Sequence, residues 1–349
     1  MTSIFNNKFL TSITLIILGI FSSFSLPPYN YFFINFLTFP FLFYILVANP
    51  IQNLLNNFLI GWFYGFGYFL SNLYWISYSL KFDENFENLI IPSIILIPAL
   101  LSIFYGLFSL CINFFNMRMN FNSILTFSLT LSLFEYLRGT IFGGFPWNLI
   151  SFSISNFNHS IQILNLLGTY SLNLIVINLY CLPIILLFKI KIHKKVVIFL
   201  TIIVILSINA NYGHNRVKHI EQTNKKEIFP SIKLISPKFN IERFFIGEPI
   251  ENRLNELIKI SSPLNKDFLL IYPEGITTIS ELKKSSNNFD QISNQLTDQS
   301  KIIMGISLEN GEKIFNSLAL FDKNFLIEDR YHKNKLVPFG EFLPFESIL

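Results

Sequence analysis

The first 212 residues consist mainly of long apolar runs separated by short polar connections. A helix needs about 20 mostly apolar residues to cross a bilayer, so runs that approach this length predict membrane-spanning helices. The Pro27–Pro28 turn between the first two runs is compatible with a tight hairpin. We predict seven spans, at about residues 9–26, 31–48, 57–78, 89–115, 122–138, 161–188 and 195–211.

The pattern changes after residue 212. Residues 213–231 are polar and predict a linker, and short apolar runs then alternate with polar segments. This alternation is typical of a layered α/β domain. We therefore expect a membrane domain over 1–212 and an α/β domain over 232–349. Within the second domain we predict strands at 231–236, 267–274, 301–307 and 314–322, with a helix at about 248–261.

The distribution of charge supports this division. The chain has 26 Lys and Arg and 22 Asp and Glu residues, and only twelve of these lie before residue 213. Charged residues make up 14% of the chain, against about 25% in soluble domains. The net charge of +4 is modest, and no Gly-rich phosphate loop or basic-aromatic pattern appears. We therefore expect no nucleic-acid partner.

Lysine and arginine residues in the short loops predict the orientation of the membrane domain. With seven spans, Lys8, Arg118 and the four-lysine loop at 189–195 share one side, and the acidic connection at 79–88 lies on the other. The positive side is cytoplasmic by this rule, so everything after residue 212 is expected outside. One span more or fewer reverses the assignment.

Two predicted strand ends carry candidate chemistry. Glu274 follows the strand at 267–272 and Pro273, while Lys333 and Lys335 follow a later strand and turn. A carboxylate at the carboxyl end of a strand can act as a general base, and a lysine can stabilise an oxyanion. Together they suggest acyl transfer, although each taken alone is more often a solvated surface residue. A nucleophile is missing from this set.

The cysteines and histidines give no support for a metal site. Cys111 and Cys181 both fall in apolar runs, where a cysteine usually serves as a small hydrophobic residue. The five histidines are scattered without ligand spacing. We expect neither a metal nor a cofactor.

The stretch RGTIFGGFPWN at 138–148 follows the fifth predicted span. Arg138 and Trp147 suit the headgroup level of a bilayer, either as anchors or as contacts to a lipid headgroup or substrate. Glu135 is the main charged residue within the spans, and a transport pathway usually shows more charges. A transporter is therefore the weaker reading.

These motifs together resemble the apolipoprotein N-acyltransferase family, the membrane branch of the nitrilase superfamily. The resemblance covers nearly the whole chain and implies a nitrilase-like αββα sandwich that is incomplete at its C-terminus. It rests on RGTIFGGFPWN, YPEG at 272–275, IFNSLALFD at 314–322 and RYHKNKLVPFGEFLP at 330–344.

The resemblance implies a Glu-Lys-Cys triad. Glu274 matches the general base, Lys333 the oxyanion lysine and Glu341 a glutamate that shapes the site, while Trp147 matches the aromatic residue of the membrane motif. Lys335 stands where the family often has histidine and receives no role. The family's cysteine lies beyond the last strand of this chain. We therefore expect a C-terminally truncated fragment that is inactive by itself.

The implied reaction is N-acylation of the diacylglyceryl-cysteine at a lipoprotein N-terminus, through a thioester formed from a phospholipid acyl donor. One departure from the family is Ser236, where glutamine is usual. The implied location is the bacterial inner membrane, with the nitrilase-like domain on the periplasmic side, and we expect a monomer. Two alternatives stay open: a membrane-tethered nitrilase-type amidase, and a non-catalytic protein that binds lipids or lipoproteins.

Overall fold

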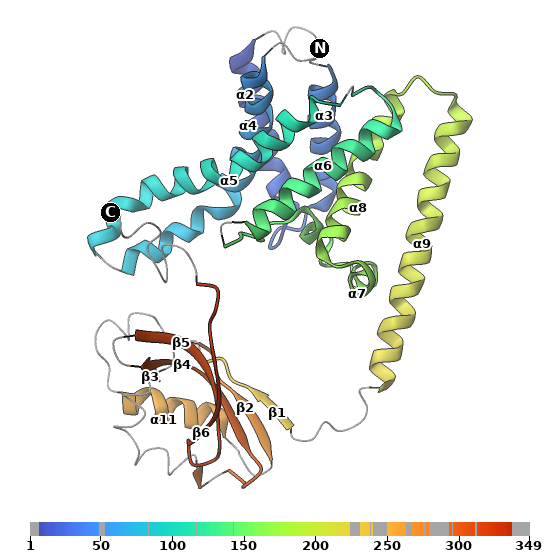
Figure 1. Cartoon of the computed structure of the whole chain (residues 1–349). Coiled ribbons are helices and arrows are strands. Elements are labelled where there is room, and N and C mark those ends of the chain that lie inside the picture. Colours follow the sequence, from blue (N-terminus) through green and yellow to red (C-terminus); the bar gives the residue numbers. More distant parts are fainter. Residues whose placement is uncertain are drawn as a thin grey trace. The chain divides into compact units, whose positions relative to one another are not determined.

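The computed structural model divides the chain into two compact units, Met1–Gln222 and Thr223–Leu349. Unit 1 is helical and unit 2 contains a sheet (Figure 1). The structure describes residues 7–48, 53–82, 84–115, 117–141, 143–223, 231–237, 239, 250–262, 267–274, 277–278, 293–294, 296–310 and 313–336.

Unit 1 is a bundle of α-helices joined by 3₁₀ turns. The α-helices are α2 (Lys8–Ser23), α3 (Asn35–Ala48), α4 (Leu54–Leu73), α5 (Ile90–Ile112), α6 (Phe121–Thr140), α7 (Leu164–Leu167), α8 (Thr169–Cys181) and α9 (Ile192–Thr223). The 3₁₀ helices are η1 (Phe32–Ile34), η2 (Tyr74–Phe82), η3 (Glu84–Leu89), η4 (Ile150–Ile154), η5 (Ser160–Ile163) and η6 (Leu182–Leu187). Asn7, Asn53 and Asn120 cap α2, α4 and α6 by accepting backbone N–H bonds, which fixes where these helices begin.

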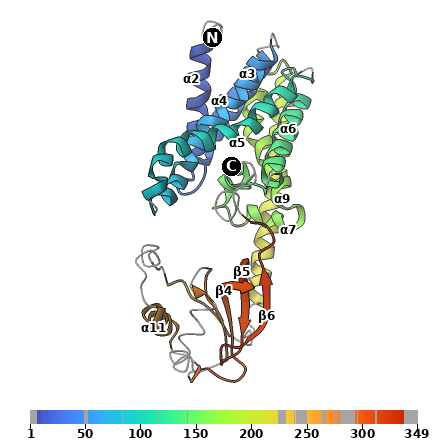
Figure 2. The ribbon, with the colours of Figure 1, turned by 60° about the vertical axis from the view of Figure 1, so that its left-hand side comes forward.

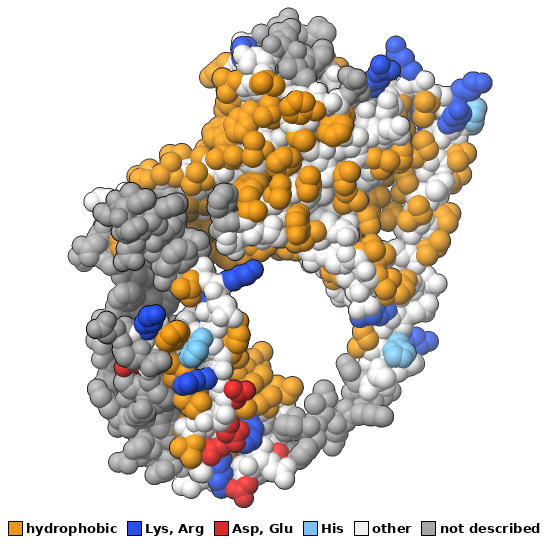
Figure 3. All heavy atoms as spheres, viewed as in Figure 1, with side chains coloured by type: hydrophobic (Ala, Val, Ile, Leu, Met, Phe, Trp, Pro, Cys, Tyr) orange, Lys and Arg blue, Asp and Glu red, His pale blue; other side chains and the backbone are white. Residues whose placement is uncertain are grey.

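Three helical stretches among the described residues are long and apolar enough to cross a membrane: Phe86–Ile112, Thr169–Leu187 and Ile192–Thr223. Two further apolar helices, Lys8–Ser23 and Phe32–Val47, are shorter. Hydrophobic side chains also cover much of the visible surface of this unit (Figure 3). These features indicate a membrane protein. Because α4 and α6 carry polar residues such as Asn57 and Glu135 within their length, the seven-span topology stays a prediction.

The end of α9 differs from the expected linker. Residues 213–223, which we assigned to the linker, continue the helix. Their polarity suggested a flexible segment, but Arg, Lys, Glu and Gln are good helix formers and no proline interrupts them.

Close helix packing in unit 1 depends on glycines. A Cβ at Gly67 of α4 would lie 2.1 Å from the carbonyl oxygen of Ile16 in α2, and one at Gly19 of α2 would lie 2.0 Å from the carbonyl oxygen of Tyr64. The backbones of α2 and α4 are therefore in direct contact at these two glycines, where only a hydrogen atom fits in place of a side chain. Small residues that allow backbones to approach are a common device of helix packing in membranes.

Unit 2 is built on a six-stranded mixed sheet. Its strands are β1 (Ser231–Leu234), β2 (Phe268–Ile271), β3 (Thr277–Thr278), β4 (Lys301–Asn310), β5 (Lys313–Phe321) and β6 (Ile327–His332), with helix α11 at Ile250–Ser261. The strand order is β1-β2-β4-β5-β6, and β3 pairs with β4. The pairs β1–β2 and β2–β4 are parallel, whereas β4–β5 and β5–β6 are antiparallel.

One face of this sheet forms the core of unit 2. Leu270, Met304, Ala319 and Phe321 from successive strands are buried together with Leu257 of α11, and α11 lies beside the sheet (Figure 2). The four predicted strands correspond to β1, β2, β4 and β5, and the predicted helix to α11. The polar strand β6 was not predicted. The described residues show a mixed sheet with a helix, and the complete αββα sandwich stays a prediction.

We predict that Gly67→Val destabilises unit 1. The new side chain must separate α2 from α4, and overpacking of this kind costs about 1–3 kcal/mol. The melting temperature in detergent should fall clearly below that of the wild type. Leu100→Val is the control, because it introduces the same side chain into a helix, α5, at a position that is 61% exposed. Equal melting temperatures for the wild type and Gly67→Val would contradict this packing.

Candidate functional site

Glu274 is held at the end of a buried strand. Strand β2 runs into Tyr272 and Pro273, and the Tyr272 hydroxyl lies 2.8 Å from the Ser261 hydroxyl of α11. Burial raises the pKa of Tyr272, an effect that the hydrogen bond with Ser261 partly offsets. Beside it, a Cβ at Gly305 of β4 would lie 2.6 Å from the Glu274 Cα. The position of the Glu274 backbone is therefore fixed by the end of β2 before it and by close contact with Gly305 of β4.

The structure brings Lys333 and Glu274 together. Lys333 follows β6, and its Nζ lies 3.9 Å from Oε1 of Glu274. Asn316 of β5 links the two, since its side-chain Nδ2 donates to Glu274 Oε1 and its carbonyl oxygen accepts from the Lys333 backbone N–H at 2.9 Å. Two predicted site residues far apart in the sequence thus meet through a third residue.

The Glu274–Lys333 pair contributes little to stability. The Glu274 side chain is 64% exposed and that of Lys333 35% exposed, and exposed pairs contribute about 0–1 kcal/mol. The arrangement instead offers one carboxylate that can accept a proton and one ammonium group that can donate to a developing negative charge. These are two of the groups that acyl transfer requires.

Ser317 and His332 are the sequence neighbours of Asn316 and Lys333. Their side chains lie on the opposite face of the sheet. Ser317 Oγ is 2.8 Å from His332 Nδ1, and Ser317 is buried. Because side chains alternate along a strand, Ser317 points away from the face that Asn316 shares with Glu274. Unit 2 contains no cysteine, and Cys111 and Cys181 lie in α5 and α8 of unit 1.

Of the remaining predicted residues, Glu341 lies outside the described residues. Lys335 is exposed, two residues after Lys333. Asn316 was not singled out from the sequence. The only signal for it was its position inside the IFNSLALFD stretch, which marked the resemblance without pointing to a side chain.

Arg138 of unit 1 is buried, and both terminal nitrogens of its guanidinium are held by the protein. Only 1% of its surface is exposed, and its Nη2 lies 3.0 Å from Glu135 Oε2 on the same helix. Its Nη1 donates to the carbonyl oxygens of Phe145 at 2.5 Å and Trp147 at 2.8 Å. Its guanidinium also lies over the Phe69 ring, 5.1 Å from the centroid. Burial of this group favours a role in positioning the loop over contact with a headgroup.

The loop after α6 returns to Arg138 through a glycine turn. Gly144 has a φ of +80°, a conformation that glycine adopts at no steric cost, and the Phe145 N–H donates to the Arg138 carbonyl oxygen at 2.8 Å. The loop then exposes the Trp147 ring, 48% of which is accessible. Trp147, unlike Arg138, is open to a molecule from the surroundings.

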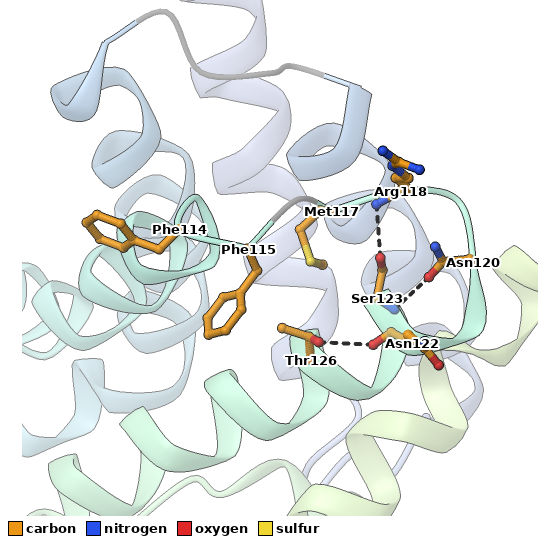
Figure 4. A pocket seen from close by; sticks show the side chains of 8 residues that line it. All are labelled: Phe114, Phe115, Met117, Arg118, Asn120, Asn122, Ser123 and Thr126. Atoms are coloured by element: carbon orange, nitrogen blue, oxygen red, sulfur yellow. Dashed lines mark hydrogen bonds between the residues drawn. The ribbon is translucent and has the colours of Figure 1, made fainter.

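A separate hollow of about 470 Å³ lies at the turn between α5 and α6. In Figure 4 the Phe115, Met117 and Thr126 side chains face one another, while the Arg118 guanidinium points away. No predicted site residue lines it. The lining consists of Phe114, Phe115, Met117, Arg118, Asn120, Asn122, Ser123 and Thr126.

The family model and the individual relatives that match this chain all carry the same family name. The family described as apolipoprotein N-acyltransferase N-terminal domain matches residues 18–182. The chain is 28% identical to the apolipoprotein N-acyltransferase of Brucella melitensis, over 95% of this chain and 65% of the relative. It is 29% identical to that of Rickettsia prowazekii, over 97% and 68%, and 30% identical to that of Rickettsia bellii, over 81% and 57%. The chain thus spans about two thirds of the length of the first two relatives.

We predict that Arg138→Met destabilises unit 1 and displaces Trp147. Removing one partner of a buried ion pair costs about 3–5 kcal/mol, and the loop loses two of its hydrogen bonds. Trp147 stacks on Trp75, with ring centroids 5.5 Å apart, so displacement should weaken the near-ultraviolet circular dichroism of the coupled indoles. Arg118→Met, at an exposed arginine, is the control. A wild-type spectrum and melting temperature for Arg138→Met would contradict the positioning role.

Proposed function

Because the chain belongs to the apolipoprotein N-acyltransferase family, we propose that this protein is a lipoprotein N-acyltransferase. The acyl donor is a phospholipid, and the acceptor is the N-terminal amine of a diacylglyceryl-cysteine. The observation that supports this most directly is the meeting of Glu274 and Lys333 within 3.9 Å. No metal or cofactor takes part in the proposed reaction.

In the first proposed step, Glu274 accepts the proton of a cysteine thiol, and the thiolate attacks the sn-1 ester carbonyl of the phospholipid. The Lys333 ammonium donates to the oxyanion of the tetrahedral intermediate. The C–O bond of the ester then breaks, Glu274 returns the proton to the departing alkoxide, and a thioester and a lysophospholipid remain. Residues 182–349 contain no cysteine, so the thiol comes from outside this part of the chain.

In the second proposed step, the lipoprotein's amine attacks the thioester carbonyl. Lys333 again stabilises the oxyanion, Glu274 accepts a proton from the attacking nitrogen, and the C–S bond breaks. The proton then returns to the sulfur. The products are an amide on the lipoprotein and the free thiol, so the enzyme is restored. Glu341, which the family resemblance assigns to the loop after Lys333, is proposed to shape this site.

The membrane unit has a clear purpose in this reaction, since both substrates carry acyl chains and reside in a bilayer. We propose that seven helices span the bacterial inner membrane, with residues 1–212 as the membrane domain and 232–349 as a nitrilase-like domain on the periplasmic side. The four-lysine loop at 189–195 supports this orientation. Trp147 is the proposed contact on the membrane side. The protein is proposed to act as a monomer.

The central prediction concerns the Glu274–Lys333 pair, tested in a protein that also carries the nucleophilic cysteine. Glu274→Gln should lower the rate by about 100-fold or more, because it removes the general base. Lys333→Met should lower it by about 100-fold through loss of oxyanion stabilisation. Asn316→Ala should lower kcat by about tenfold with KM unchanged, since it only orients the carboxylate. The measurement is mass spectrometry of a diacylglyceryl peptide incubated with phospholipid vesicles and the purified protein.

Lys335→Met is the matched control, because it removes a similar exposed charge two residues away and should retain wild-type activity. Loss of activity in this variant comparable to that of Lys333→Met would remove the specific role of Lys333. Release of free fatty acid or hydrolysis of simple amides without peptide acylation would favour the amidase alternative. Lipid or lipopeptide binding without any turnover would favour the non-catalytic one.

The proposed topology gives a separate prediction. A cysteine introduced at Ser231 should react with an impermeant maleimide added to intact spheroplasts, whereas one introduced at His193 should react only after the membrane is broken. Both are measured in a background in which Cys111 and Cys181 are replaced by serine. Labelling of the position-193 cysteine in intact spheroplasts would overturn the orientation.

A further inference from the structure

Trp75 and Trp147 form a stacked, partly exposed pair of indole rings in the helical unit. They lie on different segments, yet their rings stack with centroids 5.5 Å apart and planes inclined by 16°. Both remain about half exposed, at 45% for Trp75 and 48% for Trp147. Stacked aromatic rings usually bury most of their surface in a core. A stacked pair with about half of its surface exposed is therefore a candidate contact for another molecule.

Hydrogen bonds tie the Trp75 ring and the backbone next to Trp147 to the same helix. The Trp75 indole Nε1–H donates to the Asn72 carbonyl oxygen at 2.8 Å at the end of α4. The Tyr68 hydroxyl, also on α4, donates to the carbonyl oxygen of Asn148, directly after Trp147. The buried Arg138 binds the Trp147 carbonyl oxygen from the other side. An interfacial anchor needs no such fixed geometry, whereas a binding surface gains affinity from it.

A line of side chains continues from this stack along η2. A 3₁₀ helix has three residues per turn, so Trp75, Tyr78 and Lys81 lie on one face, with Lys81 about 12 Å along the axis from Trp75. The Lys81 ammonium lies over the Tyr78 ring, 4.6 Å from its centroid. Both Tyr78 and Lys81 are exposed. The face therefore has an indole pair at one end and a cation at the other.

This combination matches the chemistry of one phospholipid molecule. The phosphate is an anion at the headgroup level, where a lysine attracts it, and the glycerol-ester region is amphipathic and suits indole rings. We propose that Trp147, Trp75, Tyr78 and Lys81 form a lipid-binding stripe that takes the phosphate at Lys81 and the ester region on the indole pair. This proposal rests on the proposed function, because it assigns the stripe to orienting the acyl donor.

The first test measures binding without catalysis. The chain has three tryptophans, and Trp62 donates its indole N–H to Ala99 away from the stack, so Trp62→Phe leaves fluorescence from the stripe alone. The probe is a diether phospholipid with brominated chains, which cannot be cleaved, added to the protein in detergent micelles. We expect saturable quenching, and an apparent affinity about fivefold weaker in Lys81→Met. Lys189→Met, at the opposite end of the predicted topology, should leave the affinity unchanged.

The second test measures turnover with the phospholipid donor. Trp75→Ala should raise KM about fivefold to tenfold and change kcat less than twofold, because the stripe binds the donor and takes no part in bond breaking. Tyr31→Ala removes another half-exposed aromatic residue on the same predicted side and should leave both constants unchanged. Lys81→Met provides the same readout if Trp75→Ala fails to fold, since Lys81 is exposed.

The two tests separate the two proposals. Saturable quenching that depends on Lys81, in a protein that shows no acyl transfer, would support the lipid-binding stripe and overturn the proposed function. Quenching that rises linearly with lipid and is equal in Lys81→Met and Lys189→Met would show an ordinary interfacial anchor and overturn the stripe. Unchanged KM in both Trp75→Ala and Lys81→Met would also overturn it, even in an active enzyme.

Discussion

The burial of the Arg138 guanidinium is the constraint on which the arrangement of unit 1 depends. A charge removed from water costs several kcal/mol unless it is paired and its donors are satisfied. Glu135 on the same helix supplies the opposite charge, but the remaining donors need carbonyl oxygens that α6 itself cannot offer. The chain therefore folds back after α6, through the positive φ of Gly144, and delivers the carbonyls of Phe145 and Trp147. The position of the exposed Trp147 ring follows from satisfying a charge beneath it.

In unit 2 the change from parallel to antiparallel pairing places the polar groups. Strands β2 and β4 run in the same direction, so the end of β4 lies at the edge where Glu274 follows β2. Strand β5 runs back from that edge and carries Asn316 near its start, and β6 returns to it and ends just before Lys333. Three residues distant in the sequence thus converge because of strand direction alone. The close approach of the Glu274 backbone to Gly305 of β4 then fixes the position of Glu274 beside the sheet.

These two cases explain what the sequence could and could not predict. The apolar runs predicted β2, β4 and β5, because burial on at least one face leaves a clear pattern. Strand β6, with the sequence IEDRYH, is exposed along most of its length and leaves no such pattern. Asn316 was missed because a polar residue in a strand carries no signal of what lies opposite it. Arg138 was assigned to the headgroup level from its place at the end of an apolar run, and its burial depends on a loop that no local pattern specifies.

The two charged pairs differ in what they contribute, and the difference separates structure from chemistry. The Glu135–Arg138 pair is inaccessible to solvent, and the terminal nitrogens of Arg138 bind Glu135 and the loop carbonyl oxygens. Such a pair can position other residues but cannot meet a substrate. The Glu274–Lys333 pair is partly exposed, and its 3.9 Å separation exceeds hydrogen-bond distance. Its ammonium group therefore lies near the carboxylate without a hydrogen bond to it, and the carboxylate accepts the Asn316 amide instead. The buried pair fixes the loop that carries Trp147, whereas the partly exposed pair is the one available to the proposed acyl transfer, so neither could take the place of the other.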